Sequence, residues 1–70
     1  MDTREKVFSQ LEKDANGPSG VVIIPNVLMG NVSLGEIRHY LEVKGYNVVV
    51  DTDSEEVYFH YESKEGLVNA

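Results

Sequence analysis

Carboxylates are the side chains in this sequence most suited to chemistry, and half of them lie in one short segment. Residues 51–65 hold six acidic residues and one lysine, a net charge of −5 out of −6 for the whole chain. The rest of the chain holds six acids and five bases and is nearly neutral. Excess charge that serves only solubility can lie anywhere on a surface. The segment therefore indicates a local function, either cation binding or contact with a basic partner.

The acidic segment matches part of a calcium-binding loop. Asp51, Asp53, Glu55 and Glu62 fall at positions 1, 3, 5 and 12 of such a loop. The sharp turn of that loop requires glycine at position 6, where this chain has Glu56. The residues that follow alternate between apolar and polar, which is typical of a strand. We therefore expect neither a metal site nor a cofactor.

No group of residues in the sequence indicates catalysis. The chain has no cysteine, and the spacing of His39 and His60 does not predict that they meet in a zinc site. Ser33 is followed by Glu36 at the spacing of a helix capping box, which explains this serine better than a nucleophilic role. No glycine pair lies with a lysine between a strand and a helix, as a phosphate-binding loop requires. We predict a protein that is not an enzyme.

Length and composition narrow the class of protein further. Seventy residues form one small domain, residues 1–70, and without disulfides its stability must come from an apolar core or from self-association. No apolar run approaches the ~20 residues that span a bilayer, and the N-terminal residues lack the apolar stretch of a signal peptide. We expect a cytoplasmic protein with no membrane contact. Six bases scattered among acids argue against direct binding of nucleic acid.

Two segments have the hydrophobic spacing of amphipathic helices. The first covers residues 2–14 and begins with a capping box formed by Asp2 and Glu5. The second follows Ser33 and runs to residue 44, with Gly45 as its C-cap.

Three segments have the composition of strands. The unbroken β-branched run at residues 21–24 predicts a strand covered on both faces and therefore central in a sheet. Residues 46–51 and 57–62 predict a hairpin. The order helix, strand, helix, strand, strand indicates an α+β fold: a small three-stranded mixed sheet with two helices packed on one face.

The predicted hairpin separates its apolar and polar side chains. A loop of residues 53–54 or of residues 52–55 gives the same register, with Asp51 opposite Glu56. Three apolar pairs then face the helices: Val50 with Val57, Val48 with Phe59 and Tyr46 with Tyr61. The opposite face carries Asn47, Val49, Asp51, Glu56, Tyr58, His60 and Glu62. Like charges directly across a strand pair are destabilising, so we interpret their retention as a sign of function. The alternative is a solvated hairpin whose charges prevent pairing between sheet edges.

By its size, its order of elements and its acidic segment Asp51-Thr-Asp-Ser-Glu-Glu56, the chain resembles the small acidic early proteins with which bacteriophages disable host factors. Among them it is similar to the DNA mimics that inhibit the bacterial histone-like protein HU. The resemblance implies a homodimer in the cytoplasm of the bacterial host that fills the DNA-binding cleft of HU and displaces DNA. It supplies no residue-level motif. The hairpin argument alone gives the expected partner-binding residues: Asp51, Asp53, Glu55, Glu56, Tyr58 and Glu62.

Two other functions remain open from the residues. The protein could be a small interaction or structural domain that dimerises through its sheet or an apolar surface, with its acidity serving solubility only. Val27, Leu28 and Met29 could supply such a contact, although the conformation of residues 26–32 is not predicted. The third function is direct DNA binding by a helix and a hairpin wing, which is disfavoured because that wing is the acidic segment.

Overall fold

A three-stranded sheet and three helices make up the computed structural model, which describes residues 3–64. The elements are α1 (Thr3–Asp14), β1 (Ser19–Pro25), α2 (Asn26–Met29), α3 (Leu34–Val43), β2 (Tyr46–Thr52) and β3 (Glu56–Ser63). This order confirms the predicted α+β fold, with one short helix in addition.

The strand order in the sheet is β1-β3-β2, and both pairings are antiparallel. The prediction of a mixed sheet is therefore wrong, as is the prediction that residues 21–24 form the central strand. The central strand is β3, and β1 lies at an edge. In β1 only Val22 and Ile24 are buried, whereas Val21 and Ile23 are 44% and 41% exposed. An unbroken apolar run misled the prediction because half of its side chains point to an uncovered face.

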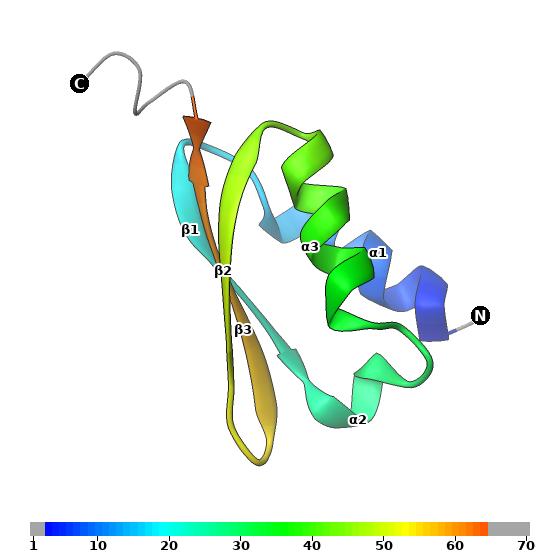
Figure 1. The fold of residues 1–70 in the computed structure, drawn as a ribbon. Coiled ribbons are helices and arrows are strands. Elements are labelled where there is room, and N and C mark those ends of the chain that lie inside the picture. Colours follow the sequence, from blue (N-terminus) through cyan, green and yellow to red (C-terminus); the bar gives the residue numbers. More distant parts are fainter. Residues whose placement is uncertain (1–2, 65–70) are drawn as a thin grey trace.

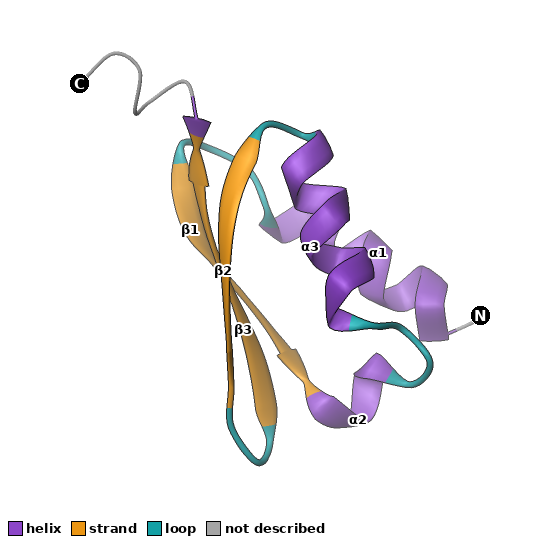
Figure 2. Cartoon of the chain, viewed as in Figure 1, coloured by secondary structure: helices purple, strands orange, loops and turns teal. Residues whose placement is uncertain are grey.

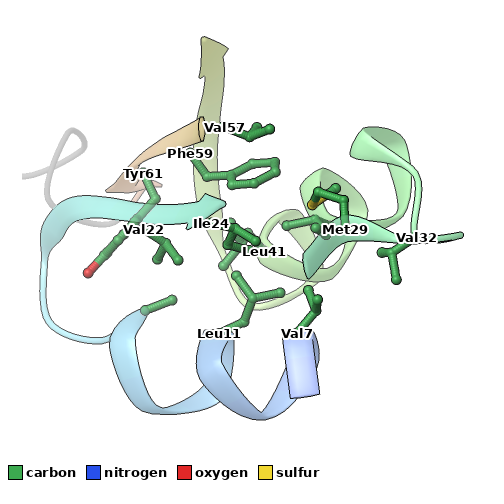
Figure 3. Close-up of a cluster of buried hydrophobic side chains, with 12 residues drawn as sticks. Val7, Leu11, Val22, Ile24, Met29, Val32, Leu41, Val57, Phe59 and Tyr61 are labelled. Carbon is green, nitrogen blue, oxygen red and sulfur yellow. The ribbon is translucent and has the colours of Figure 1, made fainter. Parts of the chain in front are cut away.

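The two long helices pack on one face of the sheet, as predicted, and no element within residues 3–64 covers the opposite face (Figures 1 and 2). The core lies between these layers, with Leu11 from α1, Leu41 from α3 and Phe59 from β3 fully buried (Figure 3). Every second residue of β3 points into this core, because side chains alternate between the faces of a strand. The acidic hairpin is thereby anchored along its inner face.

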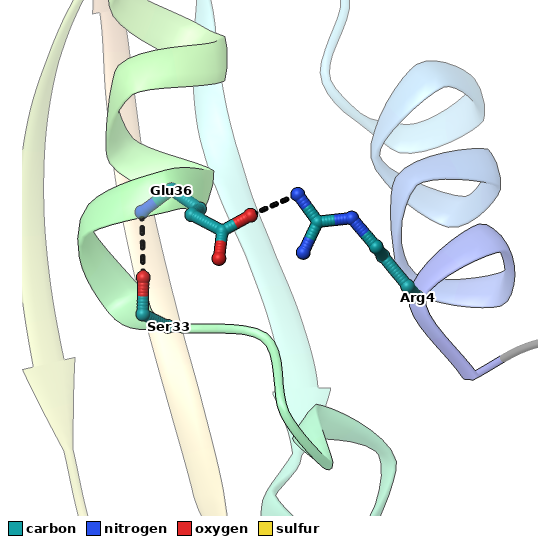
Figure 4. A network of polar contacts seen from close by, with 3 residues as sticks. All are labelled: Arg4, Ser33 and Glu36. Atoms are coloured by element: carbon teal, nitrogen blue, oxygen red, sulfur yellow. Dashed lines mark hydrogen bonds and ion pairs between the residues drawn. The ribbon is translucent and has the colours of Figure 1, made fainter.

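The limits of α3 agree with the predicted caps. The Ser33 hydroxyl accepts a hydrogen bond from the Glu36 backbone N–H at 3.1 Å. Gly45 follows the helix with a φ of 100°, and its N–H bonds to the carbonyl of Glu42. The Glu36 carboxylate forms an ion pair with Arg4 of α1 (Figure 4), which lowers the pKa of Glu36. Of the predicted box of Asp2 and Glu5, Glu5 lies in the first turn of α1, and Asp2 lies outside the described residues.

Tyr61 closes the core at one end of the sheet. Its hydroxyl donates toward the carbonyl oxygens of Asp14 and Asn16, at 3.1 and 3.0 Å. Its ring crosses the neighbouring strand at Gly20, where a Cβ atom would lie 2.6 Å from the hydroxyl oxygen. A Cβ atom at this position would therefore force Tyr61 or β1 to shift. The hydrogen bonds of the Tyr61 hydroxyl tie the end of α1 to β3.

Candidate functional site

The hairpin register differs from the predicted one by two residues. Asp51 lies opposite Tyr58 instead of Glu56, and Asn47 lies opposite Glu62. The N–H of Asp53 bonds to the carbonyl of Glu56 at 3.0 Å, so that Ser54 and Glu55 form the turn. A shift of two residues preserves the faces, because side chains repeat with a period of two. The argument from a like-charge pair of Asp51 and Glu56 does not hold.

Asp53 holds the turn with both oxygens of its carboxylate. Oδ1 accepts from the backbone N–H groups of Glu55 and Glu56, at 2.8 and 2.7 Å, and Oδ2 accepts from the Tyr58 hydroxyl at 2.8 Å. The bonds from Glu56, Glu55 and Tyr58 hold the pKa of Asp53 below its usual value. Asp53 was predicted to bind a partner, but its carboxylate is engaged in the fold. The signal for this role was the preference of Asp for turns in which it bonds the backbone two residues ahead.

Tyr58 belongs to the same network. Its hydroxyl donates to Asp53 and also lies 3.2 Å from Oε1 of Glu56. The hydrogen bond to Asp53 is the main reason that the pKa of Tyr58 is raised to about 12. The phenol is therefore neutral over the physiological range, and it fixes one side of the turn.

The turn is also tied to the rest of the molecule. The backbone N–H of Asn26 bonds to the carbonyl of Glu55 at 2.8 Å. The Asn26 side-chain amide donates to the carbonyls of Asp53 and Ser54. Asn26 begins α2, in the segment whose conformation was not predicted. Nothing in the local sequence pattern indicated this contact. The three hydrogen bonds from Asn26 make the acidic turn an ordered part of the structure.

The hairpin has four further acids: Asp51, Glu55, Glu56 and Glu62. Asp51 and Glu56 each accept one hydrogen bond within the hairpin, from the Thr52 N–H and the Tyr58 hydroxyl, whereas Asp53 accepts three. Residues 46–63 contain no Lys or Arg, and within the described part of the chain both ion pairs, Arg4 with Glu36 and Arg38 with Glu42, lie on helices. Three of the four carboxylates gather near the turn. Glu62 lies six residues along β3 from Glu56, about 20 Å at the rise of a strand. The acids therefore occupy both ends of the hairpin.

The open face between these ends carries exposed apolar side chains around His60. One row across the strands consists of Val21, His60 and Val49, and Val49 is 66% exposed. The next row toward the turn consists of Ile23, Tyr58 and Asp51. The outer positions of Val49, Tyr58 and His60 confirm the predicted face, whereas the contribution of β1 was missed because this strand was expected to be covered on both faces. The site is thus an apolar strip flanked by carboxylates.

A groove lies between α1 and α3. It has a volume of about 400 Å³ and is lined by Arg4, Phe8, Glu36, His39, Tyr40, Val43 and Lys44. The rings of Phe8 and Tyr40 meet edge to face at 5.2 Å. Lys44 lies over the Tyr40 ring, and its interaction with Tyr40 raises the pKa of the Lys44 amine. This groove carries basic groups on the side of the molecule opposite to the open sheet face.

Residues 3–64 contain no group of three or more His, Asp or Glu side chains arranged to hold a metal ion. None of the helices described is long and apolar enough to cross a membrane. Comparisons with models of known protein families, with curated proteins and with solved structures found no match to this chain.

Proposed function

We propose that this protein is a non-enzymatic DNA mimic that binds a basic DNA-binding protein of a bacterial host, of the HU kind, and displaces DNA from it. The observation that carries the proposal is the hairpin, an ordered element without Lys or Arg within residues 46–63, where four exposed or half-buried carboxylates form no ion pair with the described residues. Unneutralised charge on a rigid surface attracts basic partners and speeds their association. The proposed setting is the host cytoplasm.

Two acids on the open face near the turn lie close enough together to meet a surface built for phosphates. Asp51 pairs with Tyr58, two residues along β3 from Glu56, so Asp51 and Glu56 are diagonal neighbours roughly 7–8 Å apart. Duplex DNA carries about one charge per 1.7 Å of its axis, which is denser than one hairpin can provide. The proposal therefore includes a homodimer that presents two hairpins to the partner.

A competition experiment tests this function. A labelled DNA duplex bound to purified HU is titrated with the protein at low and moderate salt, and release is followed by fluorescence anisotropy. We expect release that weakens steeply with salt, because screening acts on exposed charge pairs. Absence of release at low salt would overturn the proposal for HU.

Matched variants locate the surface. Glu55→Gln with Glu56→Gln removes two charges from the hairpin, and Glu5→Gln with Glu12→Gln removes two from α1. We expect the hairpin pair to weaken competition at least about tenfold, as loss of interfacial charges commonly does, and the helix pair to have little effect. Equal effects of the two pairs would show that net charge, and not the hairpin, drives binding.

A second function is favoured by the exposed apolar strip. Val21, Ile23 and Val49 would suit a protein-interaction domain whose acidity serves only solubility. The segment first considered for such a contact is less suitable, since Met29 belongs to the core, although Val27 is 87% exposed. This function would be supported if Ile23→Ser abolished partner binding while the hairpin charge variants left it intact.

A further inference from the structure

The sheet has an unpaired edge at β2. Among residues 3–64, the backbone of this strand is hydrogen-bonded across the sheet to β3 alone. Because Asp53 bonds toward β3, the alternation of an antiparallel ladder directs the N–H and C=O groups of Tyr46, Val48, Val50 and Thr52 away from it. The Thr52 N–H is bonded to its neighbour's carboxylate at 2.9 Å. The other outward groups are available to a further strand.

Of the features that usually protect sheet edges, β2 has a single charged side chain, Asp51 near its end. Residues 46–52 contain no Lys, Pro or Gly, whereas the edge strand β1 contains Gly20 and ends at Pro25. The apolar side chains also differ. Val22 and Ile24 of β1 are fully buried, while Val48 and Val50, which point to the helix layer, are only half-buried. The core is therefore incomplete along β2 and complete along β1.

The sequence of β2 is complementary to itself. We propose that β2 pairs antiparallel with β2 of a second copy, about a two-fold axis that passes beside Val49. In this register Val48 lies opposite Val50 and Tyr46 opposite Thr52, so residues with outward backbone groups face each other as a ladder requires. Asn47 lies opposite Asp51, which places an amide donor beside a carboxylate. No like charges meet across the axis.

Other registers fit less well. A shift of two residues places Asp51 opposite Val49 or beyond the strand, and it shortens the ladder. A shift of one residue pairs residues whose backbone N–H and C=O groups point toward the second copy with residues whose groups point toward β3. The pairing gives a six-stranded sheet in which the half-buried valines of both copies approach each other under the two α3 helices. Leu34 of α3, which is 38% exposed, adds apolar surface to the helix layer.

This inference does not rest on the proposed function. It follows from strand order, backbone direction and the burial of side chains, and it holds for any activity of the open sheet face. A two-fold axis perpendicular to the sheet places both open faces on the same side. The carboxylates of the two hairpins then lie on one continuous surface.

Cysteine cross-linking tests the pairing directly, because the chain has no native cysteine. Val49→Cys places two thiols across the axis in a non-hydrogen-bonded pair, whose Cα separation of about 4.5 Å permits a disulfide. Val21→Cys is the matched control, since Val21 lies on the same face and in the same row at the opposite edge. We expect Val49→Cys to form covalent dimers at least about tenfold faster at low concentration under mild oxidation. Equal rates would overturn the proposal.

Mixing two variants tests the register. Asn47→Cys and Asp51→Cys should form a mixed disulfide when combined, and each alone should cross-link slowly, because identical residues at these positions lie several residues apart along the ladder. Cross-linking of each variant with itself as fast as with the other would contradict the register.

A measurement without cysteines completes the test. Sedimentation should show that the native chain dimerises and that Val49→Lys weakens the dimer by about tenfold or more, because like charges meet at the axis. Val21→Lys should dimerise normally. Circular dichroism verifies that both variants are folded. A native chain that remains monomeric at millimolar concentration would overturn the inference.

Discussion

Asp53 stabilises the acidic turn, since its carboxylate accepts three hydrogen bonds. We predict that Asp53→Ala lowers the melting temperature of the protein. The loss arises because two backbone N–H groups and one hydroxyl lose their acceptor. Glu55→Gln, two residues along the turn and without a hydrogen bond from its side chain to the turn, should leave the melting temperature nearly unchanged at moderate salt, where charge repulsion is screened. Thermal denaturation followed by circular dichroism measures both.

The effect of Asp53 depends on pH in a defined direction. Its pKa is lower in the folded protein than the usual value near 4, so its stabilising contribution is complete above that value. The contribution is lost as the pH falls through the lowered folded pKa. The gap in melting temperature between the native chain and Asp53→Ala should therefore be constant near neutrality and close in strong acid. A gap that widened on acidification would contradict this assignment.

Tyr58 should titrate apart from the other tyrosines. Its pKa is raised to about 12 by the hydrogen bond to Asp53, the burial of its phenol and the nearby negative charges. An ultraviolet absorbance titration should show a late phenolate transition that Tyr58→Phe removes. Since the folded pKa exceeds the usual value of 10.0, this bond stabilises the protein fully below pH 10 and is lost as the pH rises toward 12. Persistence of the late transition in Tyr58→Phe would assign it elsewhere.

At the scale of elements, the contact of β1 with β3 depends on a glycine. Gly20→Ala should destabilise the protein by about 1–3 kcal/mol, because the added methyl group overlaps the Tyr61 ring and hydroxyl. Gly35→Ala is the control: its φ is not positive and the nearest side-chain atom to the new Cβ lies at 3.9 Å, so helix propensity should stabilise α3 by up to about 1 kcal/mol. Urea unfolding measures both changes. Equal stability of the two variants would show that β1 moves to accommodate the methyl group.

Helices and strands that are marked by a few neighbouring residues could be predicted from the sequence. The pairing of the strands in the sheet could not. The cap at Ser33 and the glycine after α3 are encoded within a few residues, and the faces of β3 follow from strict alternation. The register of the hairpin depends on the Asp53 side chain, and the edge position of β1 depends on which strand β3 joins across the sheet. The spacing of residues within one segment does not determine such long-range pairings. The face on which the strand acids lie was therefore predicted correctly, while the hydrogen bonds of Asp53 within the turn and the apolar strip were not predicted.

At the scale of the whole molecule, acidic and basic side chains lie on different parts of the structure. The hairpin carries acids without bases, while the bases among the described residues lie outside it, on or next to the helices and at Lys64. Repulsion within the hairpin is compensated by its buried inner face and by the bonds that Asn26 and Asp53 make to the turn. The same arrangement keeps the carboxylates in fixed positions, which is what a charged binding surface requires.

The unneutralised hairpin should make the stability of the protein depend on salt. Raising NaCl from about 0.01 to about 0.3 M shortens the screening length from roughly 30 Å to under 10 Å, so the melting temperature should rise as repulsion among the acids is screened. Glu55→Gln with Glu62→Gln should raise the melting temperature at low salt and reduce its salt dependence. Glu12→Gln should act in the opposite direction at low salt, because Glu12 interacts favourably with Lys44. A melting temperature that fell with salt in the native chain would show that attraction between the helices' charges outweighs repulsion within the hairpin.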